Sequence, residues 1–366
     1  MVVAGLRLRG FRTYDRADVH LGAGLTVIHG RNGVGKTNLV EALYFGCTAR
    51  SCRTSNEREC VRFGADAARV EVDTVDRHGD AHELSVGFQP GEAKRIRVDD
   101  ALVERLVDHP ARPLVSVFLP DRLELVKGPP ALRRAHLDQV VTGLWPSRTE
   151  TRRAYRHALA QRNALLHRIR AGHLSRDSTS AWDLELARHG VALRDDRART
   201  VELLQPGFAR IAGELGLTGT PELRYRPRTT AATAQGLATE LAERLDGDLE
   251  RGFTGHGPHR DDLALLRDGR ELRVYGSQGE HRLALLALLL CEREAMAEER
   301  GAPPLMILDD VMSELDPDRR RLLVERLRDG GQSVITTTDL AHVPGGDAAD
   351  VVRIAVGEGG VLQEVR

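Results

Sequence analysis

Lysine is almost absent from this sequence. Lys36, Lys94 and Lys127 are the only lysines, and all the other members of the 53 basic residues are arginine. A compact ammonium is needed where phosphate oxygens converge, because a planar guanidinium does not fit such a cradle. Lys36 is the candidate for that position. The formal net charge of −1 excludes a surface that is cationic throughout, so any contact with nucleic acid must come from a local group of arginines.

Cysteines and long apolar runs are also scarce. Cys47, Cys52, Cys60 and Cys291 show no C-x-x-C spacing, which disfavours a zinc site and predicts reduced thiols. The longest apolar run, 283–290, is far shorter than the roughly 18 residues that a membrane span needs. The first residues contain no continuous apolar segment of the kind found in secretory signals. We therefore expect a cytoplasmic protein.

Apolar patterns divide the chain into three parts. With 366 residues the chain is long enough for about two domains. Strand patterns occupy the first and last thirds, whereas helical periodicity dominates the middle and strand patterns return only after Thr254. The predicted strands are 3–8, 25–29, 68–74, 82–88, 95–98, 304–308 and 332–336. The predicted helices are one from about Lys36, then 130–141, 149–170, 181–215 with a break expected at Pro206, 239–249, 278–299 and 316–328. This pattern predicts an α/β protein with a mixed sheet and an antiparallel flank.

A phosphate-binding loop follows the second predicted strand. Its sequence, Gly-Arg-Asn-Gly-Val-Gly-Lys-Thr, fits G-x-x-x-x-G-K-[ST] and opens a predicted helix, which is the context that the motif requires. The glycines let backbone N–H groups converge on the α- and β-phosphates, Lys36 reaches the β- and γ-oxygens, and the Thr37 hydroxyl binds Mg²⁺. We predict that ATP lies on this loop. The predicted ATP contacts in and beside it are Gly30, Arg31, Asn32, Gly33, Val34, Gly35, Lys36, Thr37 and Asn38.

An apolar strand that ends in two acids supplies the second half of such a site. Residues 305–308 are Leu-Met-Ile-Leu, and Asp309 and Asp310 follow. We predict that Asp309 holds Mg²⁺ through its water shell and that Asp310 is the catalytic general base, acting beside Lys36. The alternative is a strand that ends in a helix cap, because Asp310 and Ser313 can both cap a helix.

The spacing of these motifs predicts the domain organisation. Lys36 and Asp309 lie far apart in the sequence, yet both must reach the same Mg²⁺. The helical middle is therefore an insertion into one ATPase domain. We predict an ATPase head built from 1–118 and 255–366, and a mainly helical insertion lobe at 119–254.

Three further motifs resemble those of ABC-type ATPases. Ser277, Gln278 and Gly279 begin the long predicted helix, and the resemblance implies that they bind the γ-phosphate of a nucleotide held by the opposite subunit. An ordinary Gly-Ser helix start is the alternative. Ser313 and Asp316 match the D-loop position. Thr337 or Thr338 stands where that superfamily has a switch histidine, which leaves the efficiency of hydrolysis open.

The opening segment 6–12, the phosphate-binding loop and residues 38–42 resemble the SMC-like ABC ATPases, and we place a further ATP contact on Arg12. A narrower resemblance, to the RecF family of recombination mediators, spans nearly the whole chain, although His136 departs from the aromatic residue expected there. It is carried by 118–129, 133–138, 161–166, 182–183, 257–262, 277–280 and 308–316. The resemblance implies an ABC-type head and an ATP-dependent homodimer. It also implies binding to DNA near single-strand/double-strand junctions and loading of RecA at gaps with RecR and RecO, with slow ATP turnover that acts as a switch.

Several arginines are candidate DNA contacts. Arg152, Arg153, Arg156 and Arg162 are spaced so that several share one side of a predicted helix, and a solvated or ion-paired helix face is the alternative. Arg50 and Arg53 follow the helix of the phosphate-binding loop and can serve either DNA or the nucleotide. The segment 257–262 is either part of this function or a hinge.

Three other functions are disfavoured. An ABC transporter subunit would carry a glutamine loop and a complete Leu-Ser-Gly-Gly-Gln signature, and neither is evident here. An SMC-like structural clamp would need heptads sustained over long arms. A P-loop kinase would have no signature motif, and a nuclease would need its own acidic metal cluster.

Overall fold

The computed structural model describes residues 1–358 and 360–364. Their contacts divide the chain into two compact units, 1–122 with 296–366 and 123–295. We call the first unit the head and the second the lobe. The sequence-based boundaries, 1–118 and 255–366 against 119–254, remain a prediction of domain organisation. Residues 262–267 cluster with the lobe because they form a strand that pairs with 221–226.

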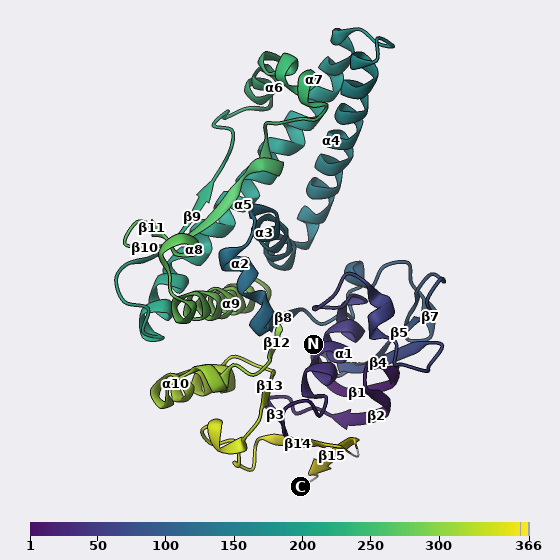
Figure 1. Cartoon of the computed structure of the whole chain (residues 1–366), viewed down its shortest axis with the longest axis vertical. Coiled ribbons are helices and arrows are strands. Elements are labelled where there is room, and N and C mark those ends of the chain that lie inside the picture. The colour runs from purple at the N-terminus through teal and green to yellow at the C-terminus, as the bar shows by residue number, and fades with distance from the viewer. Residues whose placement is uncertain (359, 365–366) are drawn as a thin grey trace. The chain divides into compact units, whose positions relative to one another are not determined.

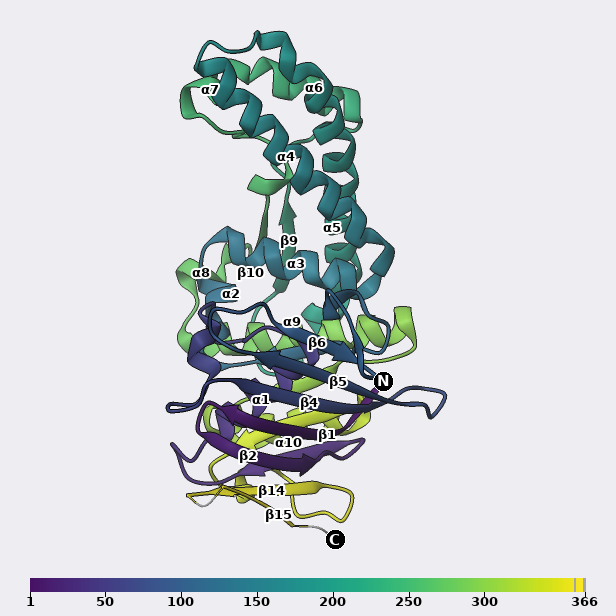
Figure 2. The same ribbon diagram turned by 90° about the vertical axis from the view of Figure 1, so that its right-hand side faces the viewer.

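The head contains two six-stranded sheets (Figures 1 and 2). The first is antiparallel and has the order β2 (Tyr14–His20), β1 (Val2–Phe11), β4 (Ala68–Val75), β5 (Ala81–Phe88), β6 (Arg95–Val98), β7 (Ala101–Leu102). The second has the order β15 (Gly360–Glu364), β14 (Val352–Gly357), β3 (Leu25–His29), β13 (Ser333–Thr337), β12 (Leu305–Leu308), β8 (Val115–Phe118). In this second sheet only the β14–β15 pair is antiparallel.

Helix α1 (Lys36–Thr48) packs against strands of both sheets, β4 and β13 among them. Its apolar residues, such as Leu39 and Phe45, are fully buried in the main core of the head. Gly46 allows the close approach, since a Cβ there would lie 2.4 Å from Cγ2 of Val72. A second helix of the head, α10 (Pro317–Asp329), links β12 to β13. This β-α-β alternation confirms the predicted α/β class.

The lobe is mainly helical and contains one small sheet. Its helices are α2 (Glu124–Lys127), α3 (Pro130–Leu144), α4 (Thr149–Arg170), α5 (Ser180–Glu214), α6 (Ala234–Glu243), α7 (Leu245–Arg251), α8 (Leu272–Tyr275) and most of α9 (Gln278–Arg300). The sheet has the order β11 (Arg270–Glu271), β10 (Asp262–Arg267), β9 (Pro221–Arg226). The long helices α4 and α5 pack along each other.

The structure corrects four predictions about the elements. The head has two separate sheets instead of one mixed sheet with a flank. Strand β9 lies before Thr254, in a segment whose arginines and glutamate concealed its alternation. The single helix predicted at 239–249 is two helices, α6 and α7. Helix α5 continues past Pro206, because the buried Phe208 and Ile211 in the following turns offset the roughly 3 kcal/mol that an internal proline costs.

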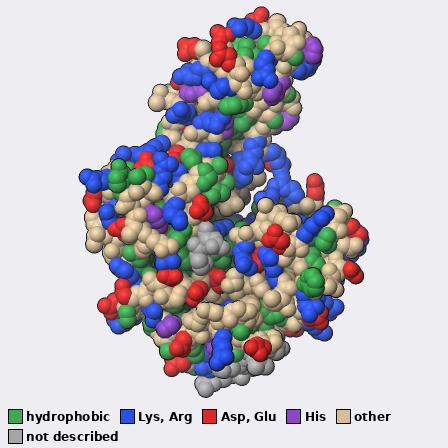
Figure 3. Space-filling view, in the orientation of Figure 1, with side chains coloured by type: hydrophobic (Ala, Val, Ile, Leu, Met, Phe, Trp, Pro, Cys, Tyr) green, Lys and Arg blue, Asp and Glu red, His purple; other side chains and the backbone are tan. Residues whose placement is uncertain are grey.

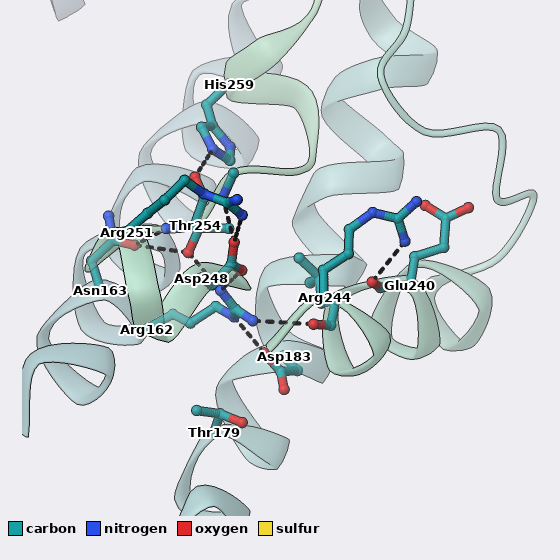
Figure 4. Close-up of polar contacts among 12 residues, drawn as sticks. Arg162, Asn163, Thr179, Asp183, Glu240, Arg244, Asp248, Arg251, Thr254 and His259 are labelled. Atoms are coloured by element: carbon teal, nitrogen blue, oxygen red, sulfur yellow. Dashed lines mark hydrogen bonds and ion pairs between the residues drawn. The ribbon is translucent and has the colours of Figure 1, made fainter. Parts of the chain in front are cut away.

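A buried ion cluster holds the lobe helices together (Figure 4). Arg162, fully buried on α4, donates to Asp183 of α5 at 2.5 Å and to Asp248 of α7 at 2.7 Å. The same guanidinium donates to Thr254 Oγ1 at 2.7 Å. Arg162 is therefore a structural residue, and the ion-paired alternative stated for this helix position is correct for it.

We expect Arg162→Met to lower the free energy of unfolding of the lobe by about 3–5 kcal/mol, because it leaves two buried carboxylates without their cation. The matched control is Arg156→Met, which changes an exposed arginine of the same helix. Both tryptophans, Trp145 and Trp182, belong to the lobe, so denaturation followed by tryptophan fluorescence reports on this unit. Equal stability of the two variants would contradict the structural role of Arg162.

His259 makes the lobe sensitive to acid. Its Nε2 donates to the Thr254 carbonyl at 2.8 Å and its Nδ1 accepts from Tyr155 Oη at 2.7 Å, and burial lowers the pKa of the imidazole from 6.5 to about 4. As the pH falls, His259 therefore becomes protonated in the unfolded chain at a higher pH than in the folded chain. We expect the free energy of unfolding to fall as the pH drops from 6.5 to about 4, by at most about 1.4 kcal/mol per pH unit from this group.

The measurement is a series of denaturation curves over that pH range for the wild type and His259→Gln. The variant should be less stable at neutral pH but should lose less stability on acidification. An unchanged pH slope in the variant would assign the acid sensitivity to other groups.

Candidate functional site

The phosphate-binding loop joins the end of β3 to the start of α1, as predicted. Gly30, Gly33 and Gly35 have φ angles of 152°, 83° and 112°, which side chains rarely permit. Gly30 also lies against β14, because a Cβ there would be 2.1 Å from the carbonyl oxygen of Val356. Tyr14 Oη donates to the Gly35 carbonyl at 3.1 Å. The loop is thus curved and supported from two neighbouring strands, with its N–H groups at a helix N-terminus that suits an anion.

Lys36 brings a buried ammonium to this curve. Its Nζ donates to the carbonyl oxygens of Gly30 and Arg31, at 2.7 and 2.9 Å. Burial lowers the pKa of Lys36, and the nearby Asp310 and Asp309 oppose that effect. The ammonium therefore lies between the loop and two carboxylates, where it can neutralise phosphate oxygens.

The acidic half of the site comes from the end of β12. Asp309, which is nearly buried, accepts from Thr37 Oγ1 at 2.9 Å and from Thr336 Oγ1 at 2.7 Å. Burial raises the pKa of Asp309, and the two hydroxyl donors act against it. A hydroxyl beside a carboxylate is a suitable ligand pair for Mg²⁺, a cation that prefers oxygen ligands. Thr37 and Asp309 therefore fit the metal role that the sequence predicted.

Asp310 differs from its neighbour. Its φ of 49° turns the chain after the strand, and its backbone N–H donates to Thr336 Oγ1 at 2.9 Å. Its Oδ1 is buried and has no hydrogen-bond partner among the residues that the structure describes. Ser313 Oγ donates to the Asp310 carbonyl at 2.9 Å, whereas Asp316 caps α10 by accepting from the N–H of Arg319. Oδ1 of Asp310 is thus not used as a helix cap, and the predicted role of this residue as a general base remains a prediction.

Thr336 was missed by the sequence analysis although it orders both acids. It is fully buried on β13, the strand next to β12, and because every residue of that strand is buried no alternation marked it in the sequence. Thr337, the proposed substitute for a switch histidine, is bonded locally: its Oγ1 donates to the Asp339 carbonyl at 2.9 Å. Any contact of Thr337 or Thr338 with a nucleotide remains a prediction.

Glu41 is a second residue that was missed. Fully buried on α1, it accepts both Nε and Nη2 of Arg12, at 2.8 and 2.7 Å, and Nη1 of Arg53 at 3.1 Å. Arg53 also donates to Asn38 at 3.2 Å. Arg12 and Arg53 therefore lie together beside the helix of the phosphate-binding loop. Arg50 and Arg53 also line a surface pocket with 51–52, 54–55, Glu57 and Lys94.

The signature residues begin α9, within the lobe. Ser277 Oγ accepts from the N–H of Glu280 at 3.3 Å, and Glu280 accepts from the N–H of Ser277 at 2.8 Å. This reciprocal arrangement is a capping box, and it leaves Ser277, Gln278 and Gly279 exposed. The geometry accommodates both alternatives, an ordinary helix start and an anion site presented to another molecule. Binding of these residues to the γ-phosphate of a nucleotide held by the opposite subunit remains a prediction.

The candidate DNA contacts come from both units of the chain. Arg50 and Arg53 belong to the head, and Arg152 and Arg156 to the lobe. Arg152 lies 3.4 Å from Asp138, whereas Arg156 is exposed. His136, the departure noted above, bonds Glu292 at 2.6 Å, so a polar pair stands where an aromatic residue was expected.

Comparison with known proteins places these features in context. The family described as the RecF/RecN/SMC N-terminal domain matches residues 2–361. A DNA replication and repair protein RecF of Symbiobacterium thermophilum is 38% identical and covers 93% of this chain and 92% of that protein. Another, from Pseudarthrobacter chlorophenolicus, is 33% identical over the full length of both.

Solved structures agree with the sequence comparison. A structure of the recombination mediator protein RecF-ATP in the RecFOR pathway has a TM-score of 0.88 and 27% identity, and covers 100% of this chain and 98% of that one. The head of an SMC protein bound to ScpA, with a TM-score of 0.61 and 16% identity, covers 100% and 98% and shares the fold. Among the described residues, no helix is both long and apolar enough to cross a membrane.

Proposed function

This chain belongs to the RecF family of the RecF/RecN/SMC N-terminal domain proteins, and from that premise we propose that it binds ATP and Mg²⁺ and joins two copies of itself on DNA. The observation that carries the proposal is the cluster of Lys36, Thr37, Asp309 and Asp310 on adjacent elements of one unit. A relative of known structure is described as RecF-ATP, which supports ATP as the ligand.

Each residue of this cluster has a distinct task. The N–H groups of the loop and the Lys36 ammonium bind the phosphates, and Thr37 and Asp309 hold Mg²⁺. Bound there, Mg²⁺ would neutralise charge on the β- and γ-phosphates. Asp310 has a free buried oxygen, so it accepts the proton of the attacking water. Without a switch histidine, turnover is slow, which suits a switch that remains in its bound state for long periods.

The partner copy completes the site in this proposal. Ser277 and the N–H groups of Gln278 and Gly279 can receive the γ-phosphate of the other copy's nucleotide, because these three residues are exposed at a helix N-terminus. Nucleotide can shift the monomer–dimer equilibrium only through such extra contacts. We further propose that the dimer holds DNA at single-strand/double-strand junctions and acts with RecR and RecO in loading RecA at gaps.

A structural clamp of the SMC type is the weaker alternative. Long coiled-coil arms would be required for it, whereas the longest helix among the described residues, α5, has 35 residues and packs along α4. The lobe therefore lacks the length that such an arm needs within the described part of the chain.

The test is sedimentation of the wild type and Ser277→Arg with ATP·Mg²⁺, with and without gapped DNA. The wild type should dimerise with ATP and hold DNA more tightly as a dimer. Ser277→Arg should bind ATP normally yet stay monomeric, because the larger side chain blocks the anion site. A wild type that binds ATP without a change in mass or in DNA affinity would refute the switch.

A further inference from the structure

The segment 252–262 of the lobe is unusually well fixed for a loop. Thr254 is bonded through its N–H and hydroxyl to Asn163 Oδ1, and the N–H of Gly255 donates to Asp248 (Figure 4). His256 bonds Glu240 at 2.5 Å, and His259 is held at both ring nitrogens.

The second half of the segment is held by arginines. Arg197 donates to the Pro258 carbonyl at 2.7 Å, and Arg134 donates to the Asp261 carbonyl at 2.8 Å. Asp262 receives two hydrogen bonds from Arg133, at 2.8 and 3.0 Å. The polar groups of this segment are thus largely committed to internal contacts, which fixes its backbone.

Two side chains of the segment remain outside this network. Phe253 is 40% exposed, although only 4% of the residues in the chain are aromatic and an exposed ring is costly in water. The guanidinium of Arg260, also exposed, lies 5.0 Å from the centre of the Phe253 ring. A rigid loop therefore presents an aromatic ring with a cation beside it.

The surroundings of this pair are basic. Exposed Arg251 is the last residue of α7 and pairs with Asp248 at 2.9 Å. Exposed Arg170 lies beside Gly252, where a Cβ would be 3.0 Å from its Nη1. Asp248 and Asp261, close to this pair in the sequence, are fully buried and already bonded within the lobe, whereas Glu250 is exposed. Figure 3 shows basic side chains, which are all arginines in this part of the chain, over the surface formed by α4, α6 and α7, with acidic side chains interspersed.

We propose that Phe253 and Arg260 form a platform on which an unpaired nucleobase of single-stranded DNA stacks, with its phosphates near Arg251 and Arg170. Base stacking on an aromatic ring tolerates any sequence, and a guanidinium beside the ring binds the backbone. The arginines around the pair favour a ligand that carries many negative charges, such as nucleic acid, over a protein with few acidic residues. This inference rests on the proposed function, since it names the part of the lobe that meets the unpaired strand.

The test is fluorescence anisotropy with a labelled single-stranded oligonucleotide and with a duplex of the same length. Phe253→Ala should weaken binding of the single strand by about 5- to 100-fold and leave duplex binding nearly unchanged. Phe253→Trp should retain affinity, whereas Phe253→Leu should not. Arg260→Ala should reduce the slope of log K against log salt by about 0.7.

Phe63→Ala is the matched control, because Phe63 is 100% exposed and belongs to the head. It should bind like the wild type. Equal affinity of Phe253→Ala and the wild type for the single strand would overturn the platform and leave the proposed function standing. If Phe253→Leu bound the single strand as tightly as the wild type, the contact would be apolar rather than aromatic, which would overturn base stacking and indicate an apolar protein-docking contact. A wild type that binds no DNA would overturn the proposed function itself.

Discussion

Lys36→Met should weaken ATP binding by about 100-fold or more, since charge-assisted hydrogen bonds to phosphate are lost in a desolvated site and the buried phosphates lose their counter-charge. The ammonium already lies at the curve of the loop, held by two carbonyl oxygens, so the side chain is placed before any ligand arrives. Methionine keeps the length of the side chain and its packing. The variant should therefore fold normally while its ATP affinity, measured by calorimetry, collapses.

The chain offers a matched control for this experiment. Lys127→Met makes the same chemical change at an exposed lysine on α2. ATP affinity should be unchanged in it. If Lys36→Met bound ATP as tightly as Lys127→Met, the phosphate-binding assignment of the loop would be wrong, and with it the proposed dimer.

Asp310→Asn should lower the rate of ATP hydrolysis by about 10²- to 10⁴-fold and leave ATP affinity within a few-fold of the wild type. The amide has the shape of the carboxylate but cannot accept the proton of the attacking water. Because the backbone N–H of Asp310 bonds Thr336, the turn after β12 does not depend on the carboxylate. The variant should therefore accumulate as the ATP-bound dimer, which single-turnover kinetics and sedimentation can measure together.

Asp309→Asn tests whether Asp309 and Asp310 have different roles. Its carboxylate accepts from Thr37 and Thr336, so the substitution should weaken Mg²⁺-dependent ATP binding as well as hydrolysis. A result in which Asp310→Asn loses binding and Asp309→Asn keeps it would reverse the assigned roles.

Local patterns predicted the strand, loop and helix around residues 30–37 because the meaning of these patterns does not depend on distant residues. The loop 30–37 is one continuous segment, and the strand that ends in Asp309 and Asp310 is recognisable from its apolar run. The α/β class followed from the same patterns. The structure brings these two segments together in one unit, on strands β3 and β12, which lie on either side of β13.

Contacts between distant segments could not be predicted in the same way. Thr336 and Glu41 are functional neighbours only because strands and helices from different parts of the chain meet at them. Arg162 has the spacing of an exposed helix position, yet it is fully buried with two aspartates supplied by α5 and α7. A single sequence does not distinguish a charge that faces water from a charge whose partners are distant in the chain.

The position of β3 has a consequence for synthesis of the protein. Strand β3, which carries the phosphate-binding loop, pairs with β13 and β14, and both are made about 300 residues later. At roughly 5–20 residues per second the ribosome needs tens of seconds to deliver them. During that time residues 25–28, three of which are apolar, have no neighbouring strands from this sheet. The nucleotide site is therefore among the last parts of the head to be completed, and ATP cannot assist folding until synthesis is nearly finished.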